Sequence, residues 1–302
     1  MKWQKKGVIF ENQLNLDWAA THTAVPIADN IGGDLFRVYF SARDNLNRSQ
    51  TGFFVIDINH PNKILYQNPL PVLAFGGLGT FDESGAMASW IVNWNSVKYL
   101  YYIGWNLGRT VPFRNAIGLA RSNDEGKTFV KQFEGPIVDR NIIDPFFTAN
   151  PCVLVERDRW RMWYLSCVKW EMFGNTPKHY YHIKCAESPD GIHWQRTGIV
   201  CIDFKSQDEY AISRPCVIRE NNLYRMWYSC RGITYRIGYA ESKDGISWER
   251  KDNEVGIDVS ESGWDSEMIE YPFVFDHKGQ RYMLYNGNDY GKTGIGLAIL
   301  EQ

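Results

Sequence analysis

The hydrophobic and polar positions of this chain alternate in short runs that recur at a period of about 60 residues. The recurring marker is a proline or a tryptophan followed by apolar residues, at Pro26, Trp90, Pro151, Pro215 and Pro272. The intervals between successive markers are 64, 61, 64 and 57 residues, so the 302 residues hold about five units. A repeat of this kind indicates an architecture built from copies of one structural module.

Each unit continues with two further segments that have the pattern of β-strands. They are rich in aromatic and β-branched residues and alternate with period two, which favours strands over helices. The second segments cover residues 35–42, 99–106, 159–167, 223–230 and 281–288, and the third cover 51–56, 117–122, 183–188, 237–242 and 295–300. Turns at Asp124, Asp190 and Asp244, to which we assign a structural role, lead to a fourth strand that starts at Phe129, Trp194 or Trp248.

Units of about 60 residues with four short antiparallel strands are typical of β-propellers. We predict an all-β, five-bladed β-propeller with four antiparallel strands per blade, forming a single domain over residues 1–302. The last unit ends after its third strand, and the segment that begins at Trp3 is similar to the one that begins at Trp194. We therefore expect residues 2–10 to form the outer strand of the last blade and to close the ring, which hides a sheet edge.

Composition narrows the function classes. The 33 basic and 35 acidic residues give no basic surface for nucleic acid, and no apolar stretch approaches a membrane span. The N-terminal segment lacks the apolar region of a signal peptide. We expect a cytoplasmic protein with neither a nucleic-acid nor a membrane partner.

Cysteine and histidine give no pattern of a metal site. None of the six cysteines forms a C-x-x-C pair, and four of them occupy repeated apolar slots of the units, so we expect structural thiols. The histidines lack a supporting ligand set. We expect no metal and no cofactor.

Two groups of residues are predicted to meet at one end of the propeller, because the start of a first strand and the loop after a second strand lie at the same end of a blade. The first group precedes the markers and is mainly acidic: Asp17, His22, Asp82, Glu83, Asp144, Asp208, Glu209, Asp265, Glu267 and Glu270. The second group follows the second strands: Arg43, Asp44, Trp105, Asn106, Trp170, Arg231 and Asn288. Arg214 and Tyr271 lie on the first strands themselves.

A ring of carboxylates at a channel mouth suits cleavage of a glycosidic bond, which needs a proton donor and a base. Asp17, Glu83, Asp144, Glu209 and Glu267 are the predicted catalytic residues. The predicted substrate-binding residues are His22, Arg43, Asp44, Asp82, Trp105, Asn106, Trp170, Arg214, Arg231, Glu270, Tyr271 and Asn288. The alternative for each carboxylate is a structural role in a turn, which a repeat copies as readily as a site.

The five units, the aromatic second strands, the S-x-D-G-x-x-W turns and the carboxylates resemble the five-bladed propeller glycosidases, which include arabinanase-like, invertase-like and mannoside-phosphorylase-like enzymes. This resemblance covers the whole chain. It implies that Asp144 corresponds to a mid-ring Asp that tunes pKa, and that Glu209 or Glu267 corresponds to the acid. The first blade departs from the pattern, with Asp17 and His22 where a strand-start Asp-Pro is expected. The chain is also similar to propeller proteins associated with bacterial surface-polysaccharide synthesis.

Arg43, Arg214 and Arg231 would bring three positive charges to the same rim, which suits an acidic sugar, a sugar phosphate or a nucleotide sugar. The alternative is that each arginine neutralises a nearby carboxylate. Three functions follow from the sequence. The first is a glycoside hydrolase that acts by acid/base catalysis, the second a transferase or phosphorylase on sugar phosphates or nucleotide sugars, and the third a carbohydrate-binding propeller without catalysis.

Overall fold

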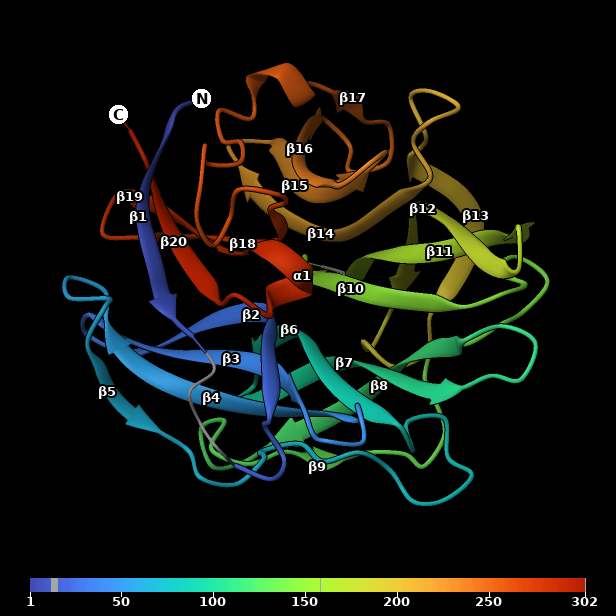
Figure 1. Cartoon of the computed structure of the whole chain (residues 1–302), viewed down its shortest axis with the longest axis horizontal. Helices are drawn as coiled ribbons and strands as arrows, with labels where there is room; N and C mark the ends of the chain where they lie inside the picture. Colours follow the sequence, from blue (N-terminus) through green and yellow to red (C-terminus); the bar gives the residue numbers. More distant parts are fainter. Residues whose placement is uncertain (12–15, 158, 302) are drawn as a thin grey trace.

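The computed structural model describes residues 1–11, 16–157 and 159–301 and is built almost entirely of antiparallel β-strands (Figure 1). The strands follow one another in sets of four along the chain. The bounds are β2 (Thr21–Gly32), β3 (Leu35–Arg43), β4 (Ser49–Asp57), β5 (Ile64–Gln67); β6 (Gly85–Trp94), β7 (Val97–Leu107), β8 (Phe113–Ser122), β9 (Val130–Lys131); β10 (Thr148–Val155), β11 (Trp160–Phe173), β12 (Thr176–Ser188), β13 (Gln195–Ile202); β14 (Ala211–Glu220), β15 (Leu223–Arg231), β16 (Tyr235–Ser242), β17 (Glu249–Arg250); and β18 (Glu270–His277), β19 (Gln280–Asn286), β20 (Ile295–Leu300), β1 (Trp3–Phe10).

Within each set, neighbouring strands pair in antiparallel ladders in the order of the bounds above. Two parallel bridges, Ser49 with Gly85 and Tyr181 with Ala211, join the first set to the second and the third set to the fourth. Two short helical segments complete the elements, the 3-10 turn η1 (Asp252–Glu254) and α1 (Asn288–Gly291). In the part of the chain that the structure describes, no helix has the length and apolar character needed to cross a bilayer.

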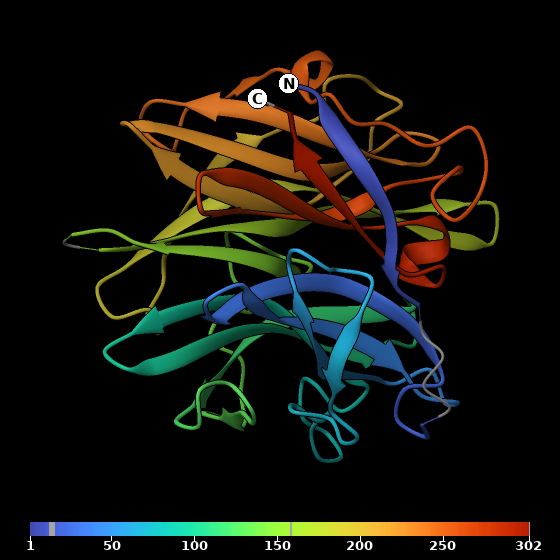
Figure 2. The same ribbon diagram turned by 90° about the vertical axis from the view of Figure 1, so that its left-hand side faces the viewer.

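The N-terminal strand β1 pairs antiparallel with the C-terminal strand β20, from Trp3 opposite Leu300 to Phe10 opposite Ile295. The two strands run side by side in both views (Figures 1 and 2). Trp3 is buried, and its indole donates a hydrogen bond of 2.9 Å to the carbonyl oxygen of Val255. The predicted pairing of residues 2–10 with the last unit is therefore observed.

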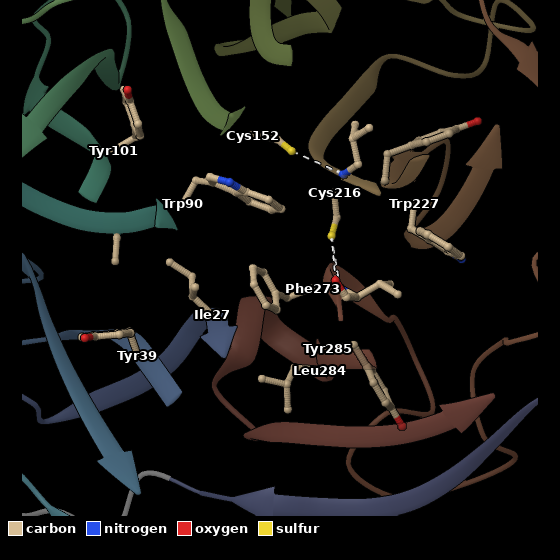
Figure 3. Packing of buried hydrophobic residues seen from close by; sticks show 14 of the residues in the cluster. Ile27, Tyr39, Trp90, Tyr101, Cys152, Cys216, Trp227, Phe273, Leu284 and Tyr285 are labelled. Carbon is tan, nitrogen blue, oxygen red and sulfur yellow. Dashed lines mark hydrogen bonds between the residues drawn. The ribbon is translucent and has the colours of Figure 1, made fainter. Parts of the chain in front are cut away.

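The first strands of the five sets, β2, β6, β10, β14 and β18, contact one another in cyclic order. Side chains from all five meet in the core, where Ile27, Trp90, Cys152, Cys216 and Phe273 lie close together (Figure 3). Backbone N–H groups donate to two of the sulfurs, at 3.3 Å for Cys152 and 3.1 Å for Cys216. The centre of the molecule is thus filled by apolar side chains, and the sulfurs belong to this packing, as free buried thiols commonly do.

The Asp turns between third and fourth strands are structural, as the sequence predicts. The Asp244 carboxylate accepts hydrogen bonds of 2.8 Å from the backbone N–H groups of Ile246 and Ser247, which lowers the pKa of Asp244 to about 2. Asp190 makes the same bonds to Ile192 and His193. Side-chain capping of this type fixes the turn without a second chain segment.

Candidate functional site

A cavity of about 440 Å³ opens at the end of the molecule where the first strands begin. All five sets contribute to its wall, mainly through the residues at the loop between their second and third strands. The wall is formed by Val25, Arg43, Asn47, Ser49, Met87, Ile103, Trp105, Leu107, Pro112, Phe113, Asn115, Phe147, Ala149, Asn150, Leu165, His179, Tyr181, Ser213, Arg231, Tyr235, Tyr271 and Tyr290. Aromatic rings, amides and hydroxyl groups dominate, and none of these wall residues is acidic.

Two arginines are the charged groups of the wall, and within the described residues neither has a carboxylate at ion-pair distance. Arg43 donates to the side-chain oxygen of Asn47 at 3.1 Å, and Arg231 donates to the hydroxyl of Tyr290 at 2.7 Å. The rings of Tyr210, Tyr235 and Tyr290 surround the Arg231 guanidinium, with centroids 5.4, 5.3 and 5.9 Å away. A cation held by aromatic rings and neutral partners retains its capacity to bind an anion.

Glu270 lies at the start of β18 and is fully buried. Neither of its carboxylate oxygens makes a hydrogen bond of normal geometry with a described residue. Burial raises the pKa of Glu270 well above its usual value, while the nearby charges of Arg231 and Arg43 act in the opposite direction. The side chain is therefore a neutral carboxylic acid next to the cavity, the form that can donate a proton.

The two histidines near the cavity are neutral. Burial and the charge of Arg231 lower the pKa of His179 to about 4, and its ring stacks on Tyr181 with 4.8 Å between centroids. Burial and the charge of Arg43 lower the pKa of His22 to about 4. His22 is half-buried beside the cavity and does not form part of the wall.

The backbone bends where each first strand reaches the cavity. The residues before the marker prolines, Val25, Asn150, Arg214 and Tyr271, have φ between 47° and 56°. The left-handed region is unfavourable for side chains other than Gly, and doubly so before proline. The ladders of all five sets are interrupted at these positions. The bulges turn Val25, Asn150 and Tyr271 into the cavity wall.

Arg214 has a different role from the one predicted. Its side chain is fully buried and crosses the centre of the molecule, where it donates hydrogen bonds to the carbonyl oxygen of Ser89 and, at 3.1 Å, to that of Pro26. The guanidinium lies 6.0 Å from the ring of Trp90 and 5.9 Å from that of Phe273. Arg214 thus joins three first strands below the cavity and does not reach its wall.

The repeated carboxylates form buried ion pairs inside their own sets. Asp144 accepts hydrogen bonds from Tyr164 at 2.9 Å, Lys184 at 3.1 Å and Arg196 at 2.8 Å. Burial alone would raise the pKa of Asp144, but Ser166 and Lys184 outweigh it and hold the pKa below its usual value. Asp144 is therefore an ionised carboxylate held between strands.

The same arrangement recurs in the other sets. Asp82 accepts from Tyr102 at 3.0 Å and pairs with Lys131, and Asp265 accepts from Tyr285 at 3.1 Å and pairs with Lys5 at 2.8 Å. In the fourth set, Glu209 pairs with Arg250 at 2.6 and 2.8 Å. Each cation comes from the outer strand of its set. The prediction that these carboxylates converge on one opening is wrong, because the outer-strand cations draw them away from the axis.

The remaining predicted residues occupy several positions around the site. Glu83 caps a turn by accepting from the N–H of Gly79 at 2.7 Å, and Asn288 accepts from the N–H groups of Glu267 and Met268. Asp44 pairs with Arg48 at 2.8 Å. Trp170 packs behind the wall, against Phe113 and Phe147. Asp17 and Glu267 are exposed, and neither they nor Asn106 contribute to the wall.

The structure brings together Arg43, Trp105, Arg231 and Tyr271 from the predicted set. Sequence reasoning missed the neutral part of the wall, including Asn150, Phe113, His179, Tyr235 and Tyr290. The residue before each marker was a usable signal, since Asn150 and Tyr271 both occupy it. In the described residues, no group of three or more His, Cys, Asp or Glu side chains is arranged to hold a metal ion.

Comparison with solved structures identifies the fold. The chain superposes on a glycoside hydrolase with a TM-score of 0.75 and 16% identity, covering 99% of this chain and 91% of the other. The structure of a BT0996 complex named for RGII matches with a TM-score of 0.76 and 16% identity over the same shares. A thermostable family-43 glycoside hydrolase (TM-score 0.67, 15% identity) covers 97% of this chain and 93% of its own. The fold is therefore that of propeller glycoside hydrolases.

Comparison with family models gives no match. Two proteins of Mycobacterium tuberculosis match from end to end, the uncharacterized protein MT1551 of strain CDC 1551 and the uncharacterized protein Rv1502 of strain H37Rv. Each is 44% identical over 301 residues, which is 100% of both chains. With identity of this extent and an all-β fold shared with glycoside hydrolases, the chain belongs to the family of MT1551 and Rv1502.

Proposed function

We propose that the protein is a glycosidase-like, carbohydrate-active protein whose cavity binds a sugar that carries a phosphate or carboxylate group. One observation carries this proposal, namely that Arg43 and Arg231 face a cavity with aromatic walls and have no ion-pair partner in the described part of the chain. Most other half-buried cations of the molecule are paired. The alternative that these two arginines neutralise neighbouring carboxylates is not favoured by this geometry.

The rest of the wall suits a sugar. Trp105, Phe113 and Tyr271 offer ring faces for stacking, and Asn47, Asn115 and Asn150 offer amides for hydroxyl groups. A concave site with apolar walls and a few polar groups is the usual form of a small-molecule site. The names of two structural neighbours refer to a carbohydrate, RGII in one and sucrose in the other. These ligands belong to those proteins, but they support a carbohydrate at the equivalent end of this fold.

We further infer that the five sets are the five blades of a propeller, closed by β1. The cyclic contacts of β2, β6, β10, β14 and β18 and the pairing of β1 with β20 support this interpretation. In such a ring the cavity is the mouth of the central channel. All five blades then contribute to a single ligand site, which explains why its residues are so far apart in the sequence.

Glu270 is the proposed proton donor to the glycosidic oxygen. Hydrolysis also needs a base to activate water. No acidic residue lies in the described wall, and this observation favours a second candidate, phosphorolysis. In that reaction a phosphate oxygen attacks the anomeric carbon, the glycosidic C–O bond breaks, and the leaving oxygen takes the proton of Glu270. The arginines would hold the phosphate, and no separate base is required.

The resemblance to proteins of surface-polysaccharide synthesis extends the proposal to a cytoplasmic step in the metabolism of phosphorylated sugars. Such sugars carry the anionic group that Arg43 and Arg231 would bind. Neutral sugars should therefore bind more weakly than their phosphates or uronic acids.

Calorimetry with glucose, glucose 1-phosphate and glucuronate tests the proposal. We expect the anionic ligands to bind more tightly, and Arg43→Ala or Arg231→Ala to weaken this binding about 10- to 100-fold, as for loss of a charge-assisted hydrogen bond. Arg157→Ala is the control, because Arg157 is exposed in the turn after β10, at the opposite end of that strand from the wall residues Ala149 and Asn150. Equal affinity for neutral and anionic sugars would overturn the proposal. Aryl glycosides with and without phosphate then distinguish hydrolysis from phosphorolysis.

A further inference from the structure

The loops around the cavity expose large apolar side chains. These are the five connections between second and third strands, at residues 43–49, 107–114, 169–178, 231–236 and 287–294. Four of them carry an aliphatic or aromatic side chain that is mostly exposed: Leu46 at 73%, Leu107 at 72%, Phe173 at 77% and Ile233 at 93%. The fifth carries Tyr290, which is partly exposed and contacts Arg231. Scattered single residues would need no explanation, but one on each loop around the same opening is a feature of the whole face.

The same five loops have a charge that differs from that of the chain. They contain nine Lys and Arg residues and three Asp and Glu residues, whereas the whole chain has a formal net charge of −2. Arg109 and Arg114 in the second loop have no acidic residue near them in that loop. The face around the cavity therefore combines exposed apolar tips with an excess of positive charge.

Apolar side chains that project from a cationic surface match the two layers of an anionic bilayer. The apolar tips can enter the boundary between headgroups and acyl chains, and the Lys and Arg residues contact the anionic headgroups. We propose that the face with the cavity is a peripheral docking surface for an anionic lipid bilayer, and that the ligand of the cavity is the anionic sugar headgroup of a lipid in that bilayer. The part of this inference that concerns the headgroup rests on the proposed anion-binding function of Arg43 and Arg231.

The arrangement also explains why the charged groups of the wall lie where they do. Arg43 and Arg231 begin the first and fourth loops, directly below the apolar tips Leu46 and Ile233. A headgroup that projects from the bilayer would reach these arginines without leaving its lipid anchor. The sequence indicates no membrane partner because no segment can span a bilayer, but docking of this kind needs no span.

Sedimentation with vesicles tests the docking surface. We expect the full chain to bind vesicles of phosphatidylcholine with phosphatidylglycerol, to bind pure phosphatidylcholine vesicles weakly, and to lose binding as salt rises. The double variant L46S/I233S should bind at least about tenfold more weakly, since it loses two buried aliphatic side chains. The control is I31S/L35S, which removes two exposed aliphatic side chains from the turn between β2 and β3, away from the cavity loops.

The outcomes are distinguishable. Absence of vesicle binding, or equal loss in the two double variants, would overturn the docking surface, and so would a stable dimer that L46S/I233S dissociates. Binding of soluble glucose 1-phosphate is independent of the apolar tips, so L46S/I233S should retain it within about twofold. If vesicles bind but glucose 1-phosphate does not, the docking surface stands and the proposed function of the cavity fails.

Discussion

The guanidinium group of Arg214 donates a hydrogen bond across the centre of the molecule to the carbonyl oxygen of Pro26, which lies 188 positions earlier in the chain. The same group binds the carbonyl oxygen of Ser89, so that one side chain from β14 holds β2 and β6. A fully buried cation without a carboxylate partner is costly, and hydrogen bonds to two carbonyl groups offset part of that cost. The bulges before the marker prolines expose these carbonyl groups to the centre.

Arg214→Ala should therefore destabilise the fold. The substitution leaves two buried carbonyl groups unsatisfied and a void among Trp90, Phe273 and the surrounding strands. We expect a loss of roughly 3 kcal/mol or more in the free energy of unfolding. Denaturant titration measures it, with Arg219→Ala on the same strand as a control that should change stability by less than about 1 kcal/mol. An Arg214→Ala protein as stable as wild type would contradict the proposed role at the centre.

Asp144→Asn tests the buried ion pairs. The substitution leaves the cations of Lys184 and Arg196 without their carboxylate, and we expect it to cost roughly 3–5 kcal/mol at pH 7. The pKa of Asp144 is lower in the folded protein than in the unfolded chain. Its contribution is therefore fully present above about pH 4 and is lost as the pH falls through the lower folded value.

The difference between wild type and Asp144→Asn in thermal unfolding should accordingly shrink below about pH 4. Asp258→Asn is the control, because Asp258 is exposed and its pair with Arg236 lies on the surface. That variant should change stability by less than about 1 kcal/mol at any pH. A pH-independent effect of Asp144→Asn would mean that it acts through shape and not through charge.

Glu270→Gln separates the neutral acid near the cavity from the carboxylates that the sequence favoured. If Glu270 donates the proton, the amide should reduce turnover by about 100-fold or more while the affinity for glucose 1-phosphate stays within a few-fold. Glu267→Gln should have little effect, since Glu267 is exposed outside the wall. Loss of activity in Glu267→Gln with full activity in Glu270→Gln would reverse this assignment.

Glu270→Gln also has a readout in stability that needs no substrate. The raised pKa means that the folded protein keeps a proton that the unfolded chain releases above about pH 4.5, so the stability of the wild type falls as the pH rises from there. The variant lacks this group. Its melting temperature should therefore gain on that of wild type between about pH 5 and pH 8.

Trp3→Ala tests the pairing of the N-terminal strand. Trp3 is buried against Trp227, with 6.2 Å between ring centroids, and its indole binds Val255. We expect a loss of about 3–5 kcal/mol, and a fall in melting temperature of at least about 5 °C. Deletion of residues 1–10 should lower it further. Lys2→Ala, which removes an exposed pair with Glu301, should leave the melting temperature within about 2 °C.

The strands could be predicted from the sequence because their alternation and aromatic content recur five times. The predicted third strand at residues 295–300 coincides with β20, and the predicted second strand at 223–230 differs from β15 by one residue. The repeat lets each unit support the assignment of the others. The ends differ more where a loop takes over, as at residues 287 and 288, which were expected in a strand and precede or begin α1.

The site could be predicted only in part, because position along a strand does not fix the direction of a side chain. Asp144 and Asp265 lie at the predicted register, but their carboxylates turn toward Arg196 and Lys5 of the outer strands. Two regularities in the sequence carry this information. A tyrosine follows each of these aspartates by twenty positions, at Tyr164 and Tyr285, and a basic residue stands two positions after the aromatic residue that opens the outer strand.

The apolar packing at the centre of the molecule has a consequence for the size of the ligand. Ile27, Cys152 and Cys216 fill the axis below the cavity, so the cavity has a floor. A polysaccharide cannot thread through from one side to the other, and a ligand must enter and leave by the same route. Only the terminal unit of a chain fits such a blind pocket, and we expect the protein to release one sugar, or one short fragment, at a time.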